Sequence, residues 1–263
     1  MERSRNLMPE NFARYYDAIV PWEKRLAREM PLLEALARAT GGRVLVPACG
    51  TGGHVVALAE RGFQVLGFDA DEGMLEVARR KLAASAASIT AAQGEADVRR
   101  LTLEEAGTLG PNFAAAFCLG NALPGLSAPG QLLAALQGIA AALRSGGTLF
   151  TQNLNFDLRW RGKAHGSPLL QGETDDEEVL LVKFSDYEAE FINFHAMFLT
   201  RKKSGGPWHS QVRTSRWVPL FRGRMADLLA QAGFTNLRFW GDYAQSPFDP
   251  DKSNDLLVAA EKS

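Results

Sequence analysis

Short, mainly apolar runs alternate with amphipathic stretches along the first 160 residues of the chain. Val44–Val46 and Phe63–Phe68 are two such runs, typical of parallel strands buried on both faces. Between them, Gly53–Arg61 carries apolar residues at helical spacing, and Gly62 follows as a stop signal. The pattern predicts a strand, a glycine-containing turn, a helix and a second strand.

The same alternation continues downstream. We expect a third strand at Ile89–Gln93, a fourth at Phe113–Leu119, a helix at Pro129–Leu143 and a fifth strand at Gly147–Leu154. Strands and helices that alternate in this way favour a parallel sheet with helices on both of its faces. The predicted fold class is therefore α/β.

The pattern changes after the fifth strand. Three strand-like runs, at Val179–Ser185, Glu188–Thr200 and Trp208–Val218, predict antiparallel strands that interrupt the alternation, with Ser185-Asp186 as the first separator. Such an insertion would cover the carboxyl edge of the sheet, where ligand specificity is usually built. The last elements are expected to be a helix and two strands, at Met225–Ala232, Leu237–Trp240 and Leu256–Ala260.

The chain has 263 residues, of which 46% are hydrophobic, enough to bury one sizeable core. We expect a single domain spanning residues 1–263. Its expected parts are an N-terminal segment, a core of alternating strands and helices, an antiparallel insertion, and a final helix with the last strands, at residues 1–42, 43–160, 161–218 and 219–263.

The turn after the first strand reads A-C-G-T-G. Gly50 and Gly52 permit open backbone dihedrals and a close approach of a ligand. Asp69 lies seventeen positions beyond Gly52, at the end of the second strand, where a carboxylate can accept both hydroxyls of a ribose. A dinucleotide fingerprint would need a third glycine where Val55 stands, which disfavours a nicotinamide-dependent oxidoreductase.

A-C-G-T-G with its distant aspartate resembles motif I of the class I S-adenosylmethionine-dependent methyltransferases. CLGNALPGL at Cys118–Leu126, GGTLFTQNLNFD at Gly146–Asp157 and FDADEGML at Phe68–Leu75 are similar to the glycine N-methyltransferase branch of that family. The resemblance covers roughly residues 15–160. It implies a Rossmann-like class I methyltransferase fold with a seven-stranded, mostly parallel sheet, and S-adenosyl-L-methionine as the cofactor.

The resemblance also implies that residues 1–42 cover the cofactor, that residues 43–160 bind it and that residues 161–218 face the substrate. It further implies individual cofactor-binding residues. Asp69 would bind the ribose, Gly50 and Gly52 would face the methionine part, and Tyr15 and Arg25 would cap its carboxylate. Adenine contacts are expected just after the third strand and at the end of the fourth. The other cofactor residues that the resemblance implies are Ala48, Ala70, Met74, Ala96, Asp97, Val98 and Leu119.

Two departures from the family pattern change the expectations. Val46 stands where most members carry an acidic residue at the end of the first strand. The missing acidic residue leaves an alternative function open, that of a non-catalytic, regulatory protein that binds S-adenosylmethionine. Leu154 stands where glycine N-methyltransferases use an arginine to hold the carboxylate of glycine, so glycine is disfavoured as the substrate.

Candidate acceptor residues follow the fourth and fifth strands. Asn121 matches the branch motif and is the candidate catalytic residue. Asn153 and Asn155 could orient a polar acceptor through their amides, although turn and cap chemistry is the alternative. Further substrate contacts that could replace Leu154 are Tyr187, Arg213 and Arg216.

Methyl transfer is an in-line displacement, to which a protein contributes mainly by positioning. A neutral amine carries a usable lone pair whereas a hydroxyl usually needs a base, so nitrogen is favoured over oxygen. A formal charge of −1, the lack of a basic stripe and the absence of a D-P-P-Y motif disfavour nucleic acid as the acceptor. We expect a small-molecule acceptor.

No apolar run approaches the roughly 18 residues of a membrane span, and no signal peptide is evident. We expect a cytoplasmic protein without a membrane partner. Cys49 and Cys118 are read as buried thiols, and a metal site is not expected. The resemblance implies a possible homo-oligomer formed through the N-terminal segment.

Overall fold

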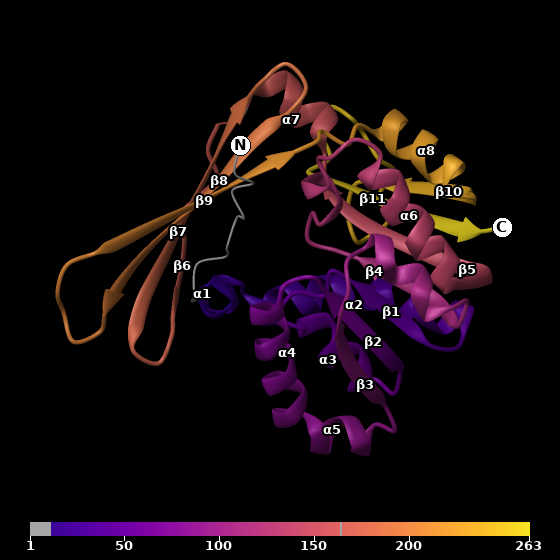
Figure 1. Ribbon diagram of the computed structural model, residues 1–263, viewed down its shortest axis with the longest axis horizontal. Coiled ribbons are helices and arrows are strands. Elements are labelled where there is room, and N and C mark those ends of the chain that lie inside the picture. Colours follow the sequence, from indigo (N-terminus) through magenta and orange to yellow (C-terminus); the bar gives the residue numbers. More distant parts are fainter. Residues whose placement is uncertain (1–11, 164) are drawn as a thin grey trace.

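A computed structural model describes residues 12–163 and 165–263. A seven-stranded sheet lies at its centre, in the order β10-β11-β5-β4-β1-β2-β3 (Figure 1). β11 is antiparallel to both of its neighbours, and the other strands are parallel to one another. The strands are β1 (Val44–Pro47), β2 (Gln64–Asp69), β3 (Glu95–Arg100), β4 (Phe113–Cys118), β5 (Leu143–Leu154), β10 (Phe234–Trp240) and β11 (Asp255–Lys262).

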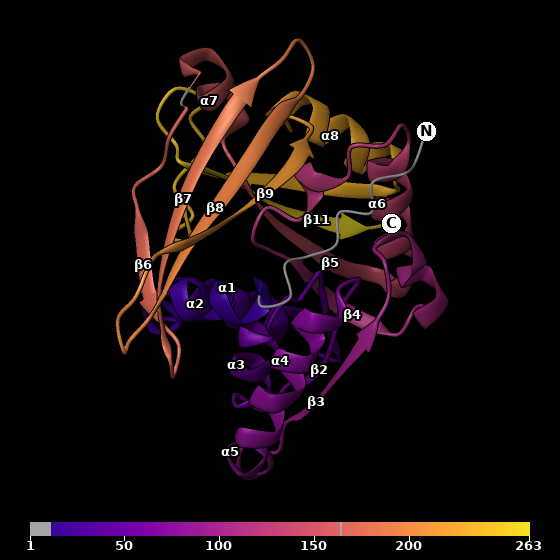
Figure 2. The ribbon, with the colours of Figure 1, turned by 60° about the vertical axis from the view of Figure 1, so that its left-hand side comes forward.

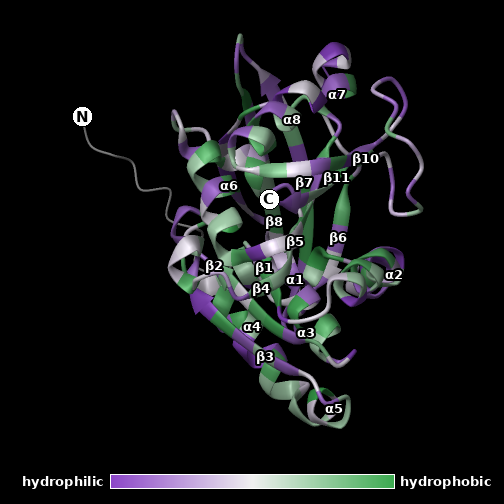
Figure 3. Ribbon diagram, turned by 90° about the vertical axis from the view of Figure 1, so that its right-hand side faces the viewer, coloured by the Kyte–Doolittle hydropathy of each residue, from purple (hydrophilic) through white to green (hydrophobic). Residues whose placement is uncertain are grey.

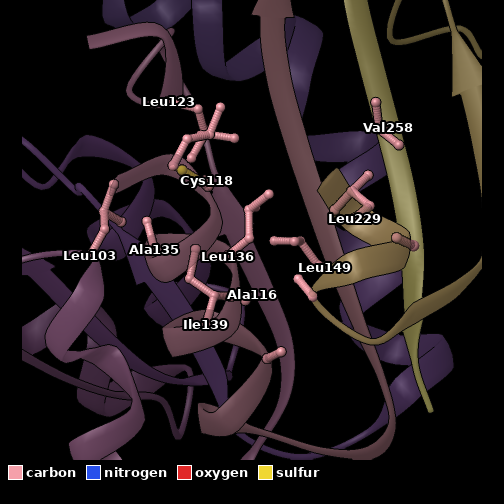
Figure 4. Packing of buried hydrophobic residues seen from close by; sticks show 14 of the residues in the cluster. Leu103, Ala116, Cys118, Leu123, Ala135, Leu136, Ile139, Leu149, Leu229 and Val258 are labelled. Carbon is pink, nitrogen blue, oxygen red and sulfur yellow. The ribbon is translucent and has the colours of Figure 1, made fainter. Parts of the chain in front are cut away.

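Helices cover both faces of this sheet. One face packs against α2, α3, α4 and α5, and the other against η1, α6 and α8; part of the second core is shown in Figure 4. Ala115 and Ala116 of β4 belong to opposite cores, because neighbouring strand residues point to opposite faces. The helices are α2 (Trp22–Thr40), α3 (Gly53–Ala59), α4 (Glu72–Ala84), α5 (Ala86–Ala91), α6 (Gln131–Ala142) and α8 (Arg222–Gln231), with the 3₁₀ turns η1 (Glu104–Leu109) and η2 (Leu123–Gly125).

This architecture confirms the predicted fold class, and most predicted elements are found. The third strand is the exception. Ile89 lies in helix α5, where it is buried, and the strand β3 begins only at Glu95. The alanine-rich segment before it favours a helix. β3 is a charged edge strand, coloured largely hydrophilic in Figure 3, so it offered no apolar run to recognise.

The predicted antiparallel insertion after β5 is also confirmed. It forms a second sheet in the order β6-β7-β8-β9, reached through α7 (Phe156–Gly162). β6 was not predicted, and the expected separator Ser185-Asp186 is wrong because it lies inside β7. The chain turns later, where Glu188 donates a backbone hydrogen bond to Phe191. The strands are β6 (Leu170–Glu173), β7 (Glu177–Tyr187), β8 (Ile192–Lys202) and β9 (His209–Trp217).

Helix α1 (Phe12–Ile19) lies between the two sheets (Figures 1 and 2). The Tyr15 hydroxyl donates to Glu177 of β7 over 3.0 Å. On its other side, the Asp17 carboxylate accepts hydrogen bonds from Thr51 of the glycine turn at 2.9 Å and from the Trp22 indole at 2.7 Å. α1 therefore ties the antiparallel sheet to the cofactor turn predicted from the sequence.

In the described part of the chain, every helix is too short or too polar to span a bilayer. The predicted absence of a signal peptide falls partly on residues 1–11, which lie outside the described residues.

Candidate active site

A cavity of about 890 Å³ opens at the carboxyl edge of the core sheet. The ends of β1, β2 and β4 form its floor, α1 and α2 form one wall, and the antiparallel sheet forms its roof. Its volume lies at the upper end of the range of roughly 300–1,000 Å³ found for ligand pockets. The predicted site residues that line it are Arg25, Ala48, Gly50, Asp69, Met74, Leu119, Asn121 and Arg213.

The glycine turn and Asp69 are joined directly. The Gly50 amide donates to Asp69 Oδ2 over 2.9 Å, and the Asp71 amide donates to Oδ1 over 3.0 Å. Gly50 has a φ of 55°, and a Cβ added there would meet nothing within 4 Å. Burial raises the pKa of Asp69, while hydrogen bonds from the two amides oppose that rise. The turn thus presents open backbone beside a buried carboxylate.

Gly52 serves packing. It adopts a φ of 76°, and a Cβ there would lie 2.8 Å from the Cβ of Ala78 in α4. It does not line the cavity. The second motif glycine therefore lets α3 and α4 approach each other, and the first one faces the cavity.

A buried ionic cluster lies along the α2 wall. The Glu29 side chain is 2% exposed and accepts hydrogen bonds from Arg25 Nε at 3.2 Å and from Arg28 Nη2 at 2.9 Å. It also contacts His54 Nε2 of α3 at 2.7 Å. Burial acts to raise the pKa of Glu29, but the contacts to His54 and Arg25 outweigh it and hold that pKa at about 2. The carboxylate fixes Arg25 through its Nε.

The guanidinium of Arg25 points its other nitrogens toward β4. Its Nη2 lies 3.5 Å from the position that a Cβ on Gly120 would take. Gly120 is the second residue after β4, so a cation stands at the carboxyl edge of that strand, across from the glycine turn. The location suits a carboxylate ligand.

Asn121 lines the cavity but is also part of the scaffold. It has a φ of 62°, and its Oδ1 accepts a hydrogen bond from the Leu154 amide at 2.6 Å. Gln152 makes a parallel link, accepting from the Gly120 amide at 2.8 Å and donating to Asp255 at 2.9 Å. These bonds hold the ends of β4, β5 and β11 in one plane. The Asn121 amide nitrogen remains to face a ligand.

Asn153 and Asn155, predicted as substrate contacts, do not line the cavity. Gln152 faces the cavity, so its neighbour Asn153 points to the other side of β5. Asn155 caps α7, accepting from the Leu158 amide at 3.2 Å, and donates to backbone carbonyls of the 249–253 loop. The structure therefore supports the cap alternative for Asn155, whereas Asn153 is buried inside β5, where its Nδ2 contacts Thr151 Oγ1 at 3.5 Å.

The adenine contacts expected at the third strand do not line the cavity. Ala96, Asp97 and Val98 lie inside β3 and do not line the cavity. Asp97 pairs with Leu66 in the middle of β2, and its half-exposed carboxylate forms a surface ion pair with Arg99. The cause is the misplaced third strand, which put these residues at a strand end.

Four other predicted residues lie outside the cavity. Tyr15 turns its hydroxyl to Glu177, and Tyr187 packs edge-on against Trp160. Arg216 ion-pairs with Glu188 and follows Ser215, which does line the cavity, so it points to the opposite face of β9. Ala70 comes after the end of β2.

Sequence reasoning missed several cavity residues, chiefly Glu29, Gln152 and Lys183. Glu29 carries a usable signal, since it shares the buried face of α2 with Leu33 and Leu36 at helical spacing. Gln152 and Lys183 carry none, because only the register of their strands decides which side they face.

The model of the "Methyltransferase domain" family matches residues 44–147, the segment that holds β1 to β5. The chain is 29% identical over 244 residues to the glycine/sarcosine N-methyltransferase of Parasynechococcus marenigrum (strain WH8102), covering 92% of this chain and 80% of that protein. The chain is a class I S-adenosylmethionine-dependent methyltransferase. It is related to the glycine N-methyltransferase branch, as its motifs indicate.

Solved structures of methyltransferases share the fold. An S-adenosylmethionine-dependent methyltransferase from Clostridium acetobutylicum ATCC 824 superposes with a TM-score of 0.74 at 13% identity, covering 96% of this chain and 98% of that one. A cofactor-bound amino pentose methyltransferase from Micromonospora echinaspora gives a TM-score of 0.66 at 19% identity, covering 98% of both chains. The two superpositions cover nearly the whole of this chain, so the fold that it shares with these methyltransferases extends beyond residues 44–147.

Proposed function

We propose that this methyltransferase transfers a methyl group from S-adenosylmethionine to a nitrogen atom of a small molecule. The observation that carries the proposal is a roofed cavity that joins the glycine turn and Asp69 to the ends of β4 and β5. A roof over that edge restricts the acceptor to a molecule that fits beside the cofactor.

The residues present fit the cofactor. We assign the ribose hydroxyls to Asp69, whose oxygens each accept one amide hydrogen and keep further lone pairs. The methionine carboxylate is assigned to Arg25, held in place by Glu29. Met74 and Leu119 supply apolar surface for the adenine. When bound, the cofactor supplies a methyl group on a sulfonium centre.

The chain's own contribution is positioning. Asn121 can donate its amide hydrogen to a polar group of the acceptor, since its oxygen is already bonded to the Leu154 amide. The stacked rings of Phe194 and Trp217, whose centroids lie 4.2 Å apart, form an apolar part of the roof. Holding the reacting atoms in near-attack geometry lowers the barrier without a covalent intermediate.

Nitrogen is favoured because a hydroxyl acceptor usually needs a general base, and the described cavity lining offers no free histidine for that role. Of the described residues that line the cavity, His54 is the only histidine, and its Nε2 is engaged by Glu29. Burial lowers the pKa of His54. The related glycine/sarcosine N-methyltransferase and the amino pentose methyltransferase are named for amine-bearing substrates, which agrees with this choice.

The test is methyl transfer from S-adenosylmethionine labelled in its methyl group to a panel of small amines, alcohols and phenols, with products identified by mass spectrometry. The proposal expects label on nitrogen and stoichiometric S-adenosylhomocysteine. Label on oxygen alone would contradict it. Cofactor binding without turnover of any compound would favour the regulatory alternative that Val46 leaves open.

A further inference from the structure

The roof of the cavity presents one face of β7, β8 and β9. Alternate residues of each strand line the cavity, as expected for one side of a sheet. This face is mostly apolar or aromatic, with two cations among its members. The residues are Leu181, Lys183, Phe194, Ala196, Phe198, Arg213, Ser215 and Trp217.

The two cations stand in one row across the three strands. Lys183 pairs with Ala196 of β8, and Ala196 pairs with Arg213 of β9. Two strand spacings separate their backbones, about 10 Å. Ala196, between them, also lines the cavity. An anionic group bound in the cavity beside this row would lie within reach of both long side chains.

Neither cation forms a direct ion pair with a described residue. Over residues 12–163 and 165–263, no carboxylate lies within 4 Å of Lys183 Nζ or of the Arg213 guanidinium, and Arg213 instead stacks over the Phe12 ring at 4.7 Å. Burial lowers the pKa of both groups. Nearby Arg25 lowers the pKa of Lys183 further, whereas the carboxylates of Asp71 and Asp69 act to raise that of Arg213. Partly buried cations without partners are costly, and a bound anion would offset that cost.

The net charge of the cavity lining also favours an anionic ligand. Its described lining holds five lysine and arginine side chains against three aspartate and glutamate side chains. S-adenosylmethionine adds a sulfonium and an ammonium against one carboxylate, so it raises the positive excess. An acceptor that enters this cavity is favoured electrostatically if it is an anion.

We propose that the acceptor is an amine that also carries an anionic group, a carboxylate or a phosphonate, and that Lys183 and Arg213 hold this group from the roof. The proposal rests on the proposed function for the methyl transfer itself. Leu154, at the end of β5, has no charge with which to hold such an anion. Lys183 and Arg213 would hold it from the roof instead, and they would thereby determine which acceptors bind.

Binding is tested first, on the full chain saturated with S-adenosylhomocysteine. Calorimetric titrations use matched pairs that differ in charge: sarcosine against sarcosinamide, β-alanine against β-alaninamide, and 2-aminoethylphosphonate against ethanolamine. Carboxylates and phosphonates form separate arms, so the class of anion is identified. The wild type is expected to bind at least one acid about tenfold or more tighter than its neutral partner.

Variants then locate the preference. Lys183→Met and Arg213→Gln are each expected to weaken binding of the acid about ten- to hundredfold, and to leave its neutral partner nearly unchanged. Arg201→Gln and Lys203→Met are matched controls. They remove exposed cations of the same sheet that pair with Glu178 and Glu173. The controls are expected to keep the wild-type preference.

Three results would overturn the inference: no acid binds to the wild type, the neutral partners bind as tightly, or the two variants keep the preference. An equal loss of S-adenosylhomocysteine affinity in Lys183→Met and Arg213→Gln would assign the pair to the cofactor and also overturn it. The proposed function fails separately. Acids that bind through Lys183 and Arg213 without ever receiving a methyl group would support the anion site and contradict the methyl transfer to nitrogen.

Discussion

The buried carboxylate of Glu29 offers the sharpest test of how the cofactor wall is held together. Replacing it by glutamine keeps the size of the side chain and removes its charge. The glutamine would leave Arg25 and Arg28 without an anion between them, and it would turn an amide group toward at least one donor. We therefore expect Glu29→Gln to destabilise the fold.

The magnitude follows from the pKa. The pKa of Glu29 is lowered from its ordinary value of 4.5 to about 2, and each pKa unit corresponds to about 1.4 kcal/mol. The ionised side chain therefore contributes about 3 kcal/mol near neutral pH, in the range of 3–5 kcal/mol typical of a broken buried ion pair. Its side chain is 2% exposed, so solvent screens this interaction little.

The sign of the pH dependence is fixed by the lowered pKa. A carboxyl group that is more acidic in the folded state contributes its full stability above the ordinary pKa of 4.5, and loses it as the pH falls through about 2. The difference between wild type and Glu29→Gln should be constant from pH 7 to about pH 5.5. It should shrink to roughly half or less at pH 3.

The assay is urea denaturation followed by circular dichroism at several pH values between 7 and 3. Glu34→Gln is the control on the same helix, because Glu34 pairs with Arg38 and Arg61 on the surface and should cost no more than about 1 kcal/mol. A loss below 1 kcal/mol for Glu29→Gln at pH 7, or a loss that does not shrink at pH 3, would refute the reasoning.

Two further substitutions test roles that the structure assigns against the sequence. Gly52→Ala should lower the free energy of unfolding by more than about 1 kcal/mol, because it combines a φ of 76° with a 2.8 Å approach to Ala78. Gly130→Ala, at a φ of 74° with open space around it, is the thermal-melting control and should lose less. Asn155→Ala should cost about 1–3 kcal/mol through the α7 cap and the 249–253 loop. Its KM for the acceptor should not change, and a raised KM at unchanged stability would restore the substrate role.

The core of this fold could be predicted because its signals are local. β1, β2 and β4 are apolar runs, and the turn at Gly50 can be recognised by its glycine residues. β3 could not be found in the same way. Its sequence EADVRR is that of a solvated edge strand, while the more apolar ITAAQ before it closes a helix and leads into a turn. Tertiary position overrode the local pattern there.

The candidate site could be predicted only where function follows directly from position at a strand end. Asp69 and Leu119 satisfy that condition, and both line the cavity. Residues within strands depend on which face is turned inward. Gln152 and Asn153 differ by one position and point to opposite sides, and the fifth-strand sequence alone does not say which side is the cavity.

The roof shows the same limit more strongly. β9 has no apolar alternation, since Val212 is 54% exposed while the adjacent Arg213 turns to the cavity. Sequence reasoning could propose Arg213 and Arg216 together but could not separate them. Lys183 lies on a face with Val179 and Leu181, and its place in the cavity depends on the pairing of β7 with β8.

The central claim is that S-adenosylmethionine binds at the carboxyl edge of β2 through Asp69. Calorimetric titration with S-adenosylhomocysteine, with NADH in parallel, tests it most directly on wild type, Asp69→Asn and Asp97→Asn. The account predicts that NADH does not bind, that Asp69→Asn weakens S-adenosylhomocysteine binding about tenfold or more, and that Asp97→Asn matches wild type. Binding that survives Asp69→Asn but is lost in Asp97→Asn would contradict it, as would binding of NADH alone.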